Sequence, residues 1–232
     1  MPLADIIERH ARASPDRCAL HFEGEDVSYN QLWQRIERTT DVLRVHGVKL
    51  GDRVAYMGLN DPAMLVLLFA LARLGAILLP LNYRLAPAEL RAILDHSEAG
   101  LMVTDEHHAT VAAALTSAGG LKSVPLASLS VNELVVADQA VPQSVVLDQL
   151  PVLLVYTSGT TGKPKGALHT QAGLVWNCVI SVHAHDLSSS DHVLTVLPMF
   201  HVGGLCIQTL PALHAGAMVT LHRRFEAGAW LR

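Results

Sequence analysis

Apolar positions along the chain follow two spacings, one typical of amphipathic helices and one typical of short buried strands. The helical spacing predicts helices near residues 3–11, 30–46, 87–96, 109–116, 172–182 and 202–213. Short apolar runs that end at turn residues predict strands near residues 19–22, 26–29, 53–57, 101–104, 151–155, 166–170, 192–197 and 217–221. This alternation favours an α/β fold with layered, largely parallel sheets and flanking helices.

The longest apolar run covers residues 63–81 and has to be distinguished from a membrane span. Arg73 lies within it, and Gly75 and Pro80 divide it into two parts. The preceding Asn60-Asp61-Pro62 offers a capping side chain followed by a proline for the first helical turn. We therefore interpret the run as a buried helix followed by a strand.

Between residues 128 and 149 the pattern loses its period, and Pro, Gln and Asp are scattered through it. This composition is typical of a surface connection. A division into subdomains is expected near residues 128–150. Phe225-Glu226, close to the last residue given, is interpreted as the start of a further helix.

Composition narrows the class of protein. Hydrophobic residues make up 50% of the 232 residues and charged residues 16%, which suits strands buried on both faces. The net charge of −4 gives no electrostatic footprint for nucleic acid or anionic lipid. Three cysteines without metal-ligand spacing indicate a reducing compartment, and the first residues lack a basic-then-apolar signal segment. We expect a cytoplasmic protein that is not an integral membrane protein.

Candidate chemistry is concentrated in the stretch YTSGTTGKPKG at residues 156–166, directly after a predicted buried strand. It combines four aliphatic hydroxyls, three glycines and two lysines. Glycines let backbone N–H groups approach an anion, hydroxyls donate hydrogen bonds to phosphate oxygens, and lysines supply positive charge. The pattern predicts a polyphosphate site. The spacing is not that of a Walker A loop, and a flexible linker is disfavoured because the lysines and the preceding strand do not fit one.

Three further motifs accompany this loop. They are PMFH at residues 198–201 followed by Gly203-Gly204, SYNQL at residues 28–32, and LGA through PLN at residues 74–82. Together with the loop, they closely resemble the adenylate-forming superfamily, which includes acyl- and aryl-CoA synthetases, luciferases and peptide-synthetase adenylation domains. The Pro-x-Phe-His form resembles the CoA ligases more than the peptide-synthetase domains. The resemblance covers nearly the whole chain.

The resemblance implies a reaction in two halves. A small-molecule carboxylic acid reacts with ATP and Mg²⁺ to give an acyl-adenylate, and coenzyme A then accepts the acyl group, as in fatty acid metabolism. By family position, Lys165 and His201 are the catalytic residues, and Thr157 also reaches the magnesium. The nucleotide-binding residues implied are Thr157, Ser158, Gly159, Thr160, Thr161, Gly162 and Lys163.

The resemblance also implies that residues 1–232 form an incomplete N-terminal domain, without the C-terminal lid domain. We therefore expect the isolated chain to be inactive, and either to self-associate or to fold as less than the whole 232 residues. A homo-oligomer is a further expectation for the protein. Two alternatives stay open: an adenylation enzyme that loads a carrier protein, and a non-catalytic nucleotide-binding fragment.

Two other groups of histidines could suggest a metal site, namely His107-His108 and His183-x-His185-Asp186. Neither group has a third ligand at suitable spacing, so we interpret both as solvated surface. Relatives often carry Thr-His after the loop, where this chain has Thr170-Gln171. No role of that histidine is transferred to this chain.

Overall fold

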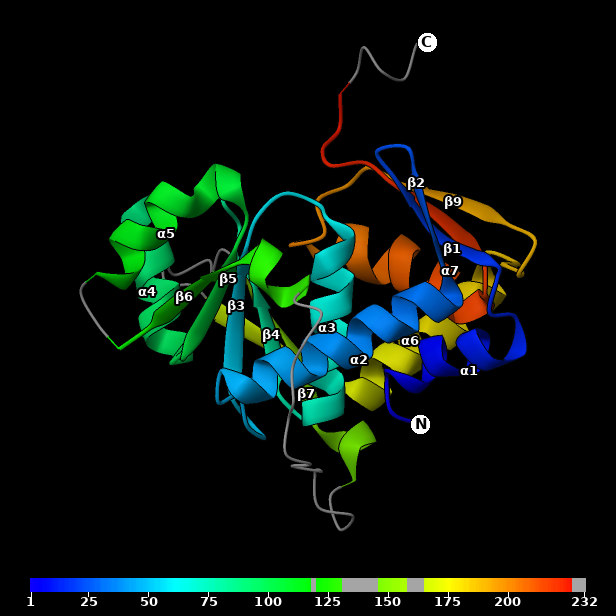
Figure 1. Cartoon of the computed structure of the whole chain (residues 1–232), viewed down its shortest axis with the longest axis horizontal. Helices are drawn as coiled ribbons and strands as arrows, with labels where there is room; N and C mark the ends of the chain where they lie inside the picture. The colour runs from blue at the N-terminus through cyan, green and yellow to red at the C-terminus, as the bar shows by residue number, and fades with distance from the viewer. Residues whose placement is uncertain (118–119, 131–145, 158–164, 227–232) are drawn as a thin grey trace.

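The computed structural model describes residues 1–117, 120–130, 146–157 and 165–226, and Figure 1 shows the course of the chain. The helices are α1 (Asp5–Ala13), α2 (Tyr29–Val45), α3 (Pro62–Leu74), α4 (Pro87–Ser97), α5 (Ala109–Thr116), α6 (Gln171–Ala184), the π-helix η4 (Gly203–Thr209) and α7 (Leu210–Ala215). The strands are β1 (Cys18–Phe22), β2 (Glu25–Ser28), β3 (Arg53–Met57), β4 (Ile77–Pro80), β5 (Leu101–Thr104), β6 (Lys122–Pro125), β7 (Pro151–Thr157), β8 (Lys165–Thr170), β9 (His192–Thr195) and β10 (Met218–Leu221).

Within these described residues the strands form two sheets. One has six strands in the order β6-β5-β3-β4-β7-β8, and the other has four in the order β2-β1-β10-β9. Neighbours are parallel except at β7–β8 and β1–β2, which are antiparallel. The predicted α/β fold with layered sheets is confirmed, and each predicted strand and helix up to β10 is found within a few residues of its expected place. The helix expected to begin at Phe225-Glu226 is not present at those two residues, and residues 227–232 lie outside the described part.

Helix α3 lies in the middle of the molecule, between the two sheets, as Figure 1 shows. Almost every side chain of α3 is buried, and its residues belong to one apolar cluster with residues of β1, β3, β7 and β10. The side chain of Asp61 accepts a hydrogen bond from the Ala63 N–H at 2.9 Å, and Gly75 ends the helix in a left-handed conformation. The apolar run is therefore a buried helix and strand, as predicted. No helix in the described ranges is long and apolar enough to cross a membrane.

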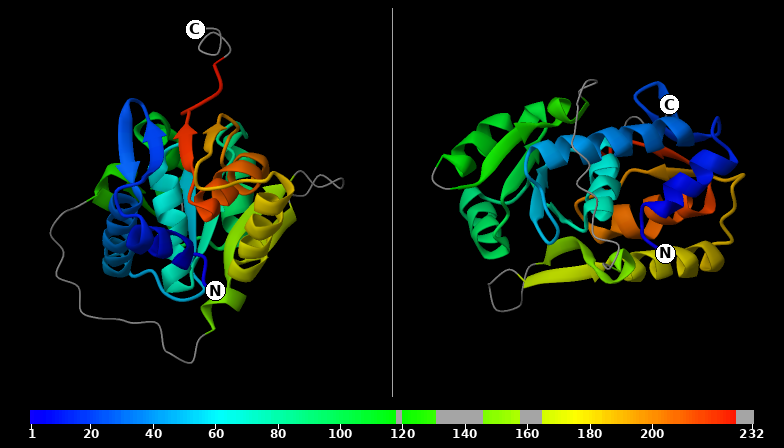
Figure 2. Two further views of the ribbon diagram at one scale, coloured as in Figure 1. Left: turned by 90° about the vertical axis from the view of Figure 1, so that its right-hand side faces the viewer. Right: turned by 60° about the horizontal axis from the view of Figure 1, so that its bottom comes forward.

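Helix α2 packs across α3 and also contacts α1, and Figure 2 shows these helices from two further sides. A capping box starts α2: the Ser28 hydroxyl accepts from the Gln31 N–H, and the Gln31 side chain accepts from the Ser28 N–H. The motif at residues 28–32 therefore fixes where a long helix begins.

Gln171, at the start of α6, is fully buried and joins two distant segments. Its Oε1 accepts from the Leu3 N–H at 2.8 Å, and its Nε2 donates to the Ala72 carbonyl oxygen at 2.8 Å. Gln171 therefore connects the segment just before α1 to the last turn of α3 by hydrogen bonds. It is the residue that stands where relatives often have histidine.

Helix α6 exposes an apolar stripe. Trp176 and Ile180 are each 65% exposed and Val179 is 37% exposed, and residues three and four apart share one helix face. The expected self-association of the isolated chain stays a prediction, and this stripe is the surface that would drive it.

We expect Gln171→Ala to lower the free energy of unfolding by about 1–3 kcal/mol, because it leaves the Leu3 N–H buried without a partner and takes from the Ala72 carbonyl one of its two donors, the other being the Gly75 N–H. The exposed Gln34→Ala should change it by less than about 0.5 kcal/mol. Urea denaturation of both variants measures the difference. Equal stabilities would show that these hydrogen bonds of Gln171 do not stabilise the fold.

Candidate active site

The carboxyl ends of the parallel strands meet at one edge of the molecule. In open parallel α/β sheets, ligands bind in the crevice outside this edge. From the six-stranded sheet it carries the segments after β3, β4, β5 and β7, and from the four-stranded sheet those after β9 and β10. Hydrogen bonds from Asn60, directly after β3, to the segments after β9 and β10 show that the two edges adjoin.

Thr157 and Lys165 mark the two ends of the glycine-rich loop. Thr157 is the last residue of β7, Lys165 is the first residue of β8, and the two are paired in antiparallel register. Both side chains are exposed. Ser158, Gly159, Thr160, Thr161, Gly162 and Lys163 lie outside the described residues.

Gly166 of β8 lies close against two side chains of β7. A Cβ atom at this position would lie 2.8 Å from Leu154 Cδ1 and 3.3 Å from Tyr156 Cζ. A glycine next to Lys165 therefore lets the strands pair over the Leu154 and Tyr156 side chains. The Tyr156 hydroxyl is in turn hydrogen bonded to His96 Nδ1 on α4.

His201 lies in the turn between β9 and η4, and its ring is exposed. Its Nδ1 is 3.1 Å from the Gly203 backbone nitrogen. Since a backbone N–H can only donate, Nδ1 is the acceptor, and the neutral ring carries its proton on Nε2. The Nε2–H of the ring is therefore left as a hydrogen-bond donor on an exposed side chain.

The ring of His201 lines a cavity of about 310 Å³ together with Asn82, Arg84, Phe200 and Gly204. The guanidinium of Arg84 lies 5.6 Å from the centre of the Tyr83 ring and 5.7 Å from that of Phe200. Arg84 forms no ion pair with any residue that the structure describes. Among the described residues, Arg84 is therefore an unpaired cation beside His201. The sequence analysis did not identify it, although its position shortly after a buried strand could have indicated it.

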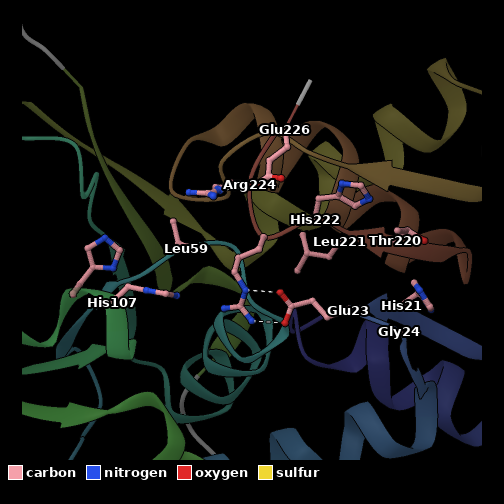
Figure 3. A pocket seen from close by; sticks show the side chains of 12 residues that line it. His21, Glu23, Gly24, Leu59, His107, Thr220, Leu221, His222, Arg224 and Glu226 are labelled. Atoms are coloured by element: carbon pink, nitrogen blue, oxygen red, sulfur yellow. Dashed lines mark hydrogen bonds and ion pairs between the residues drawn. The ribbon is translucent and has the colours of Figure 1, made fainter. Parts of the chain in front are cut away.

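A second, larger cavity of about 690 Å³ opens at the same edge, as Figure 3 shows. Arg223 lies in it and donates two hydrogen bonds of 2.7 Å to the Glu23 carboxylate. Hydrogen bonding to Arg223 lowers the pKa of Glu23, whereas burial raises the pKa of Asp61, which lies 3.6 Å from Arg223. Arg224 pairs with Glu226 at 2.8 Å. The arginines of this cavity are thus compensated, unlike Arg84.

The histidines outside the motif fall into two groups. His107, His183 and His185 are exposed, as predicted. His108 is not solvated surface: it is half-buried, its Nδ1 is 2.6 Å from Asp105 Oδ1, and its ring packs on Tyr83. The prediction failed there because Asp105 caps the turn from its buried position and draws the ring inward.

The described residues alone do not suit a magnesium ion. Mg²⁺ in proteins is usually held by one or two carboxylates together with substrate phosphates. Thr157 offers one neutral oxygen, and no group of three histidine, cysteine or acidic residues lies close enough together among the described residues to hold a metal. We therefore derive no step through the metal and treat it as part of the nucleotide substrate.

Comparison with known proteins identifies the family. A sequence profile of the AMP-binding enzymes matches residues 7–232. The chain belongs to the AMP-binding enzyme family. It is 45% identical to indoleacetate–CoA ligase of Aromatoleum aromaticum over 99% of its length and 43% identical to feruloyl-CoA synthase of Amycolatopsis over 96%. The matched parts are 46% and 44% of those proteins, so the chain spans about half the length of the curated relatives it matches.

Solved structures agree with the family assignment. The o-succinylbenzoate CoA synthetase of Bacillus subtilis, bound to its acyl-adenylate intermediate, matches 98% of this chain with a TM-score of 0.83 and 27% identity. The chain covers 58% of that structure. Another structure of that enzyme holds ATP and a magnesium ion, and the two-sheet fold is therefore one that has been solved with nucleotide bound.

Gly204 constrains the turn that carries His201. A Cβ atom there would lie 2.6 Å from the carbonyl oxygens of both Leu197 and Pro198, so neither backbone group could stay in place. We expect Gly204→Ala to destabilise the protein by about 1–3 kcal/mol. Gly100→Ala is the matched control, because nothing lies within 4 Å of its Cβ position. Thermal or urea unfolding that shows no difference between the two would contradict this packing.

Proposed function

We propose that the whole protein activates a carboxylic acid with ATP and transfers the acyl group to coenzyme A. The observation that carries the proposal is the edge where Thr157 and Lys165 bracket the glycine-rich loop and where His201, whose Nδ1 accepts from the Gly203 N–H, lines a cavity. The names of the relatives support it, since those reported above act as CoA ligases or synthetases.

In the first half-reaction a carboxylate oxygen of the acid attacks the α-phosphorus of ATP. An O–P bond forms, the bond from the α-phosphorus to the bridging oxygen breaks, and pyrophosphate leaves. Negative charge builds on the leaving group, and fixed donors and cations aimed at it stabilise the transition state. In our proposal Thr157, Ser158, Gly159, Thr160, Thr161, Gly162 and Lys163 bind the nucleotide, and Lys165 neutralises this charge.

In the second half-reaction the sulfur of coenzyme A attacks the acyl carbon, its thiol proton passes to solvent, and oxyanion character develops at the carbonyl oxygen as the C–S bond forms. The bond from the acyl carbon to the phosphate oxygen of AMP then breaks, and AMP leaves. We assign the Nε2–H of His201 as a hydrogen-bond donor to this carbonyl oxygen. In the first half-reaction the same N–H orients the carboxylate of the acid. The uncompensated charge of Arg84 adds a favourable potential for anions in the same cavity.

The relatives also suggest which acids to test first. Indoleacetate and ferulate, named in the two relatives above 40% identity, are both aromatic acids. We propose an aromatic acid as substrate class. An ATP–pyrophosphate exchange assay of the whole protein with aromatic and aliphatic acids tests this. If none of the acids gives exchange above that of a control without enzyme, the proposed function is overturned.

The two alternatives are less well supported. Loading of a carrier protein has no support from the relatives reported above, whose names specify CoA. A non-catalytic nucleotide-binding role would leave the His201 donor without use.

We further propose that residues 1–232 belong to a larger N-terminal domain that a C-terminal lid domain completes, because the relatives are about twice as long. A cytoplasmic location fits the three free cysteines, and homo-oligomer formation stays a proposal.

Replacing Lys165 separates binding from chemistry. If its charge acts mainly on the leaving pyrophosphate, Lys165→Ala lowers kcat for adenylation about 10²–10³-fold and changes the KM for ATP less. Lys122→Ala is the matched control, since Lys122 is also an exposed lysine that opens an edge strand, at the far side of the same sheet. Single-turnover adenylation at saturating ATP measures the chemical step. A wild-type rate with weaker ATP binding would make Lys165 a ground-state anchor.

A further inference from the structure

Asn60 connects three segments at the ligand-binding edge. Its Nδ2 donates to the carbonyl oxygens of Leu197 and His222, each at 3.0 Å. Its Oδ1 accepts from the Met199 N–H at 2.8 Å, and its own N–H donates to the Arg223 carbonyl oxygen at 3.2 Å. The side chain follows β3 of one sheet, and all its partners follow β9 or β10 of the other.

Asn60 is buried, and both hydrogens of its amide are used. Only a side chain that accepts at one atom and donates twice at another fits this position. An aspartate of the same shape would place a second oxygen against two carbonyl oxygens, and an alanine would leave two carbonyls and one N–H without partners.

The bonds of Asn60 lie on both sides of Pro198, at the start of the turn that carries His201. The same turn continues with the His201 N–H donating to the Pro198 carbonyl oxygen at 3.2 Å and the Gly203 N–H donating to His201 Nδ1. The turn has no regular secondary structure of its own at Pro198–His201, so its place relative to the six-stranded sheet is set by these hydrogen bonds together with the buried Met199 side chain and the edge contact of the Phe200 ring with Tyr83.

We propose that Asn60 is a positioning residue for His201. Its amide fixes the turn of residues 197–201 against the end of β3, and β3 belongs to the six-stranded sheet, whose strands β7 and β8 flank the glycine-rich loop. This inference rests on the proposed acid activation, because only there does the place of His201 affect a rate. A donor displaced by about 1 Å can lose roughly 10²-fold in rate while substrate binding persists.

Gln171 provides a matched control within the same chain. It is also a buried amide that joins two segments through its oxygen and its nitrogen, and it lies at the opposite edge of the sheet, after the end of β8 that pairs with Pro151. Loss of either amide should reduce stability. Only the loss of Asn60 should affect His201.

The experiment compares Asn60→Ala, Asn60→Asp and Gln171→Ala in the whole protein. Adenylation is followed with the best acid from the exchange assay, and the His201 tautomer is followed by long-range ¹H–¹⁵N NMR, with its signal identified by its loss in His201→Gln. Asn60→Asp keeps the volume of the side chain, so it also answers the question if Asn60→Ala does not fold.

We expect both Asn60 variants to lower kcat by roughly 10²-fold with the KM for ATP changed less than about threefold, and to lose the single Nε2–H tautomer of His201. Gln171→Ala should keep the tautomer and a kcat within about twofold of wild type. Variants of Asn60 that behave like Gln171→Ala in both readouts would overturn the proposal. If wild-type protein activates no acid, the proposed function fails, and the NMR comparison still decides whether Asn60 positions His201.

Discussion

The burial of α3 between the two sheets is the constraint on which the rest of the structure depends. A helix that is apolar on all sides has to be covered on all sides. Strands β4 and β7 of the six-stranded sheet cover one side and α2 covers another, and residues of α1, β1 and β10 belong to the same apolar cluster. The N-terminus of α3 is then fastened to the second sheet, by the four hydrogen bonds of Asn60 and by the approach of Asp61 to Arg223. One core therefore sets the relative position of two sheets, and with it the ligand-binding edge.

The electrostatics of that edge follow from the same arrangement. Arg223 is held by Glu23 and Asp61 and lies 4.8 Å from the Phe22 ring centre, so its charge serves to join β1, β10 and α3. Arg84 stacks only on aromatic rings among the described residues, which leaves its charge available to a ligand. Arg223 therefore stabilises the fold, whereas Arg84 gives the cavity that His201 lines a positive electrostatic potential.

The sequence predicted the elements well because their signals are local. The helix start at Asn60-Asp61-Pro62, the αL glycine at Gly75 and the capping box at Ser28 each act within a few residues. The assignment of each strand to one of the two sheets was not predicted, since strand order depends on pairings far apart in sequence, such as β1 with β10. The cross-sheet bonds of Asn60 span 137 to 162 residues, and no local pattern encodes them.

The site was predictable only in part, for the same reason. The family resemblance pointed to Thr157, Lys165 and His201, and the described residues at these positions lie on the edge where ligands bind in such sheets. It gave no indication of the His201 tautomer, which the Gly203 N–H fixes, or of the free charge of Arg84. His108 was misjudged because a buried aspartate three residues earlier turns it inward.

The most direct test of the account is a crystal structure of the whole protein with a non-hydrolysable acyl-adenylate analogue. The account predicts the phosphate of the analogue at the glycine-rich loop, with Thr157 Oγ1 within hydrogen-bond distance. It also predicts His201 Nε2 at about 3 Å from an oxygen of the acyl or phosphate group. An analogue bound away from the carboxyl edge of the sheets, or a His201 ring turned away from it, would contradict the central claim.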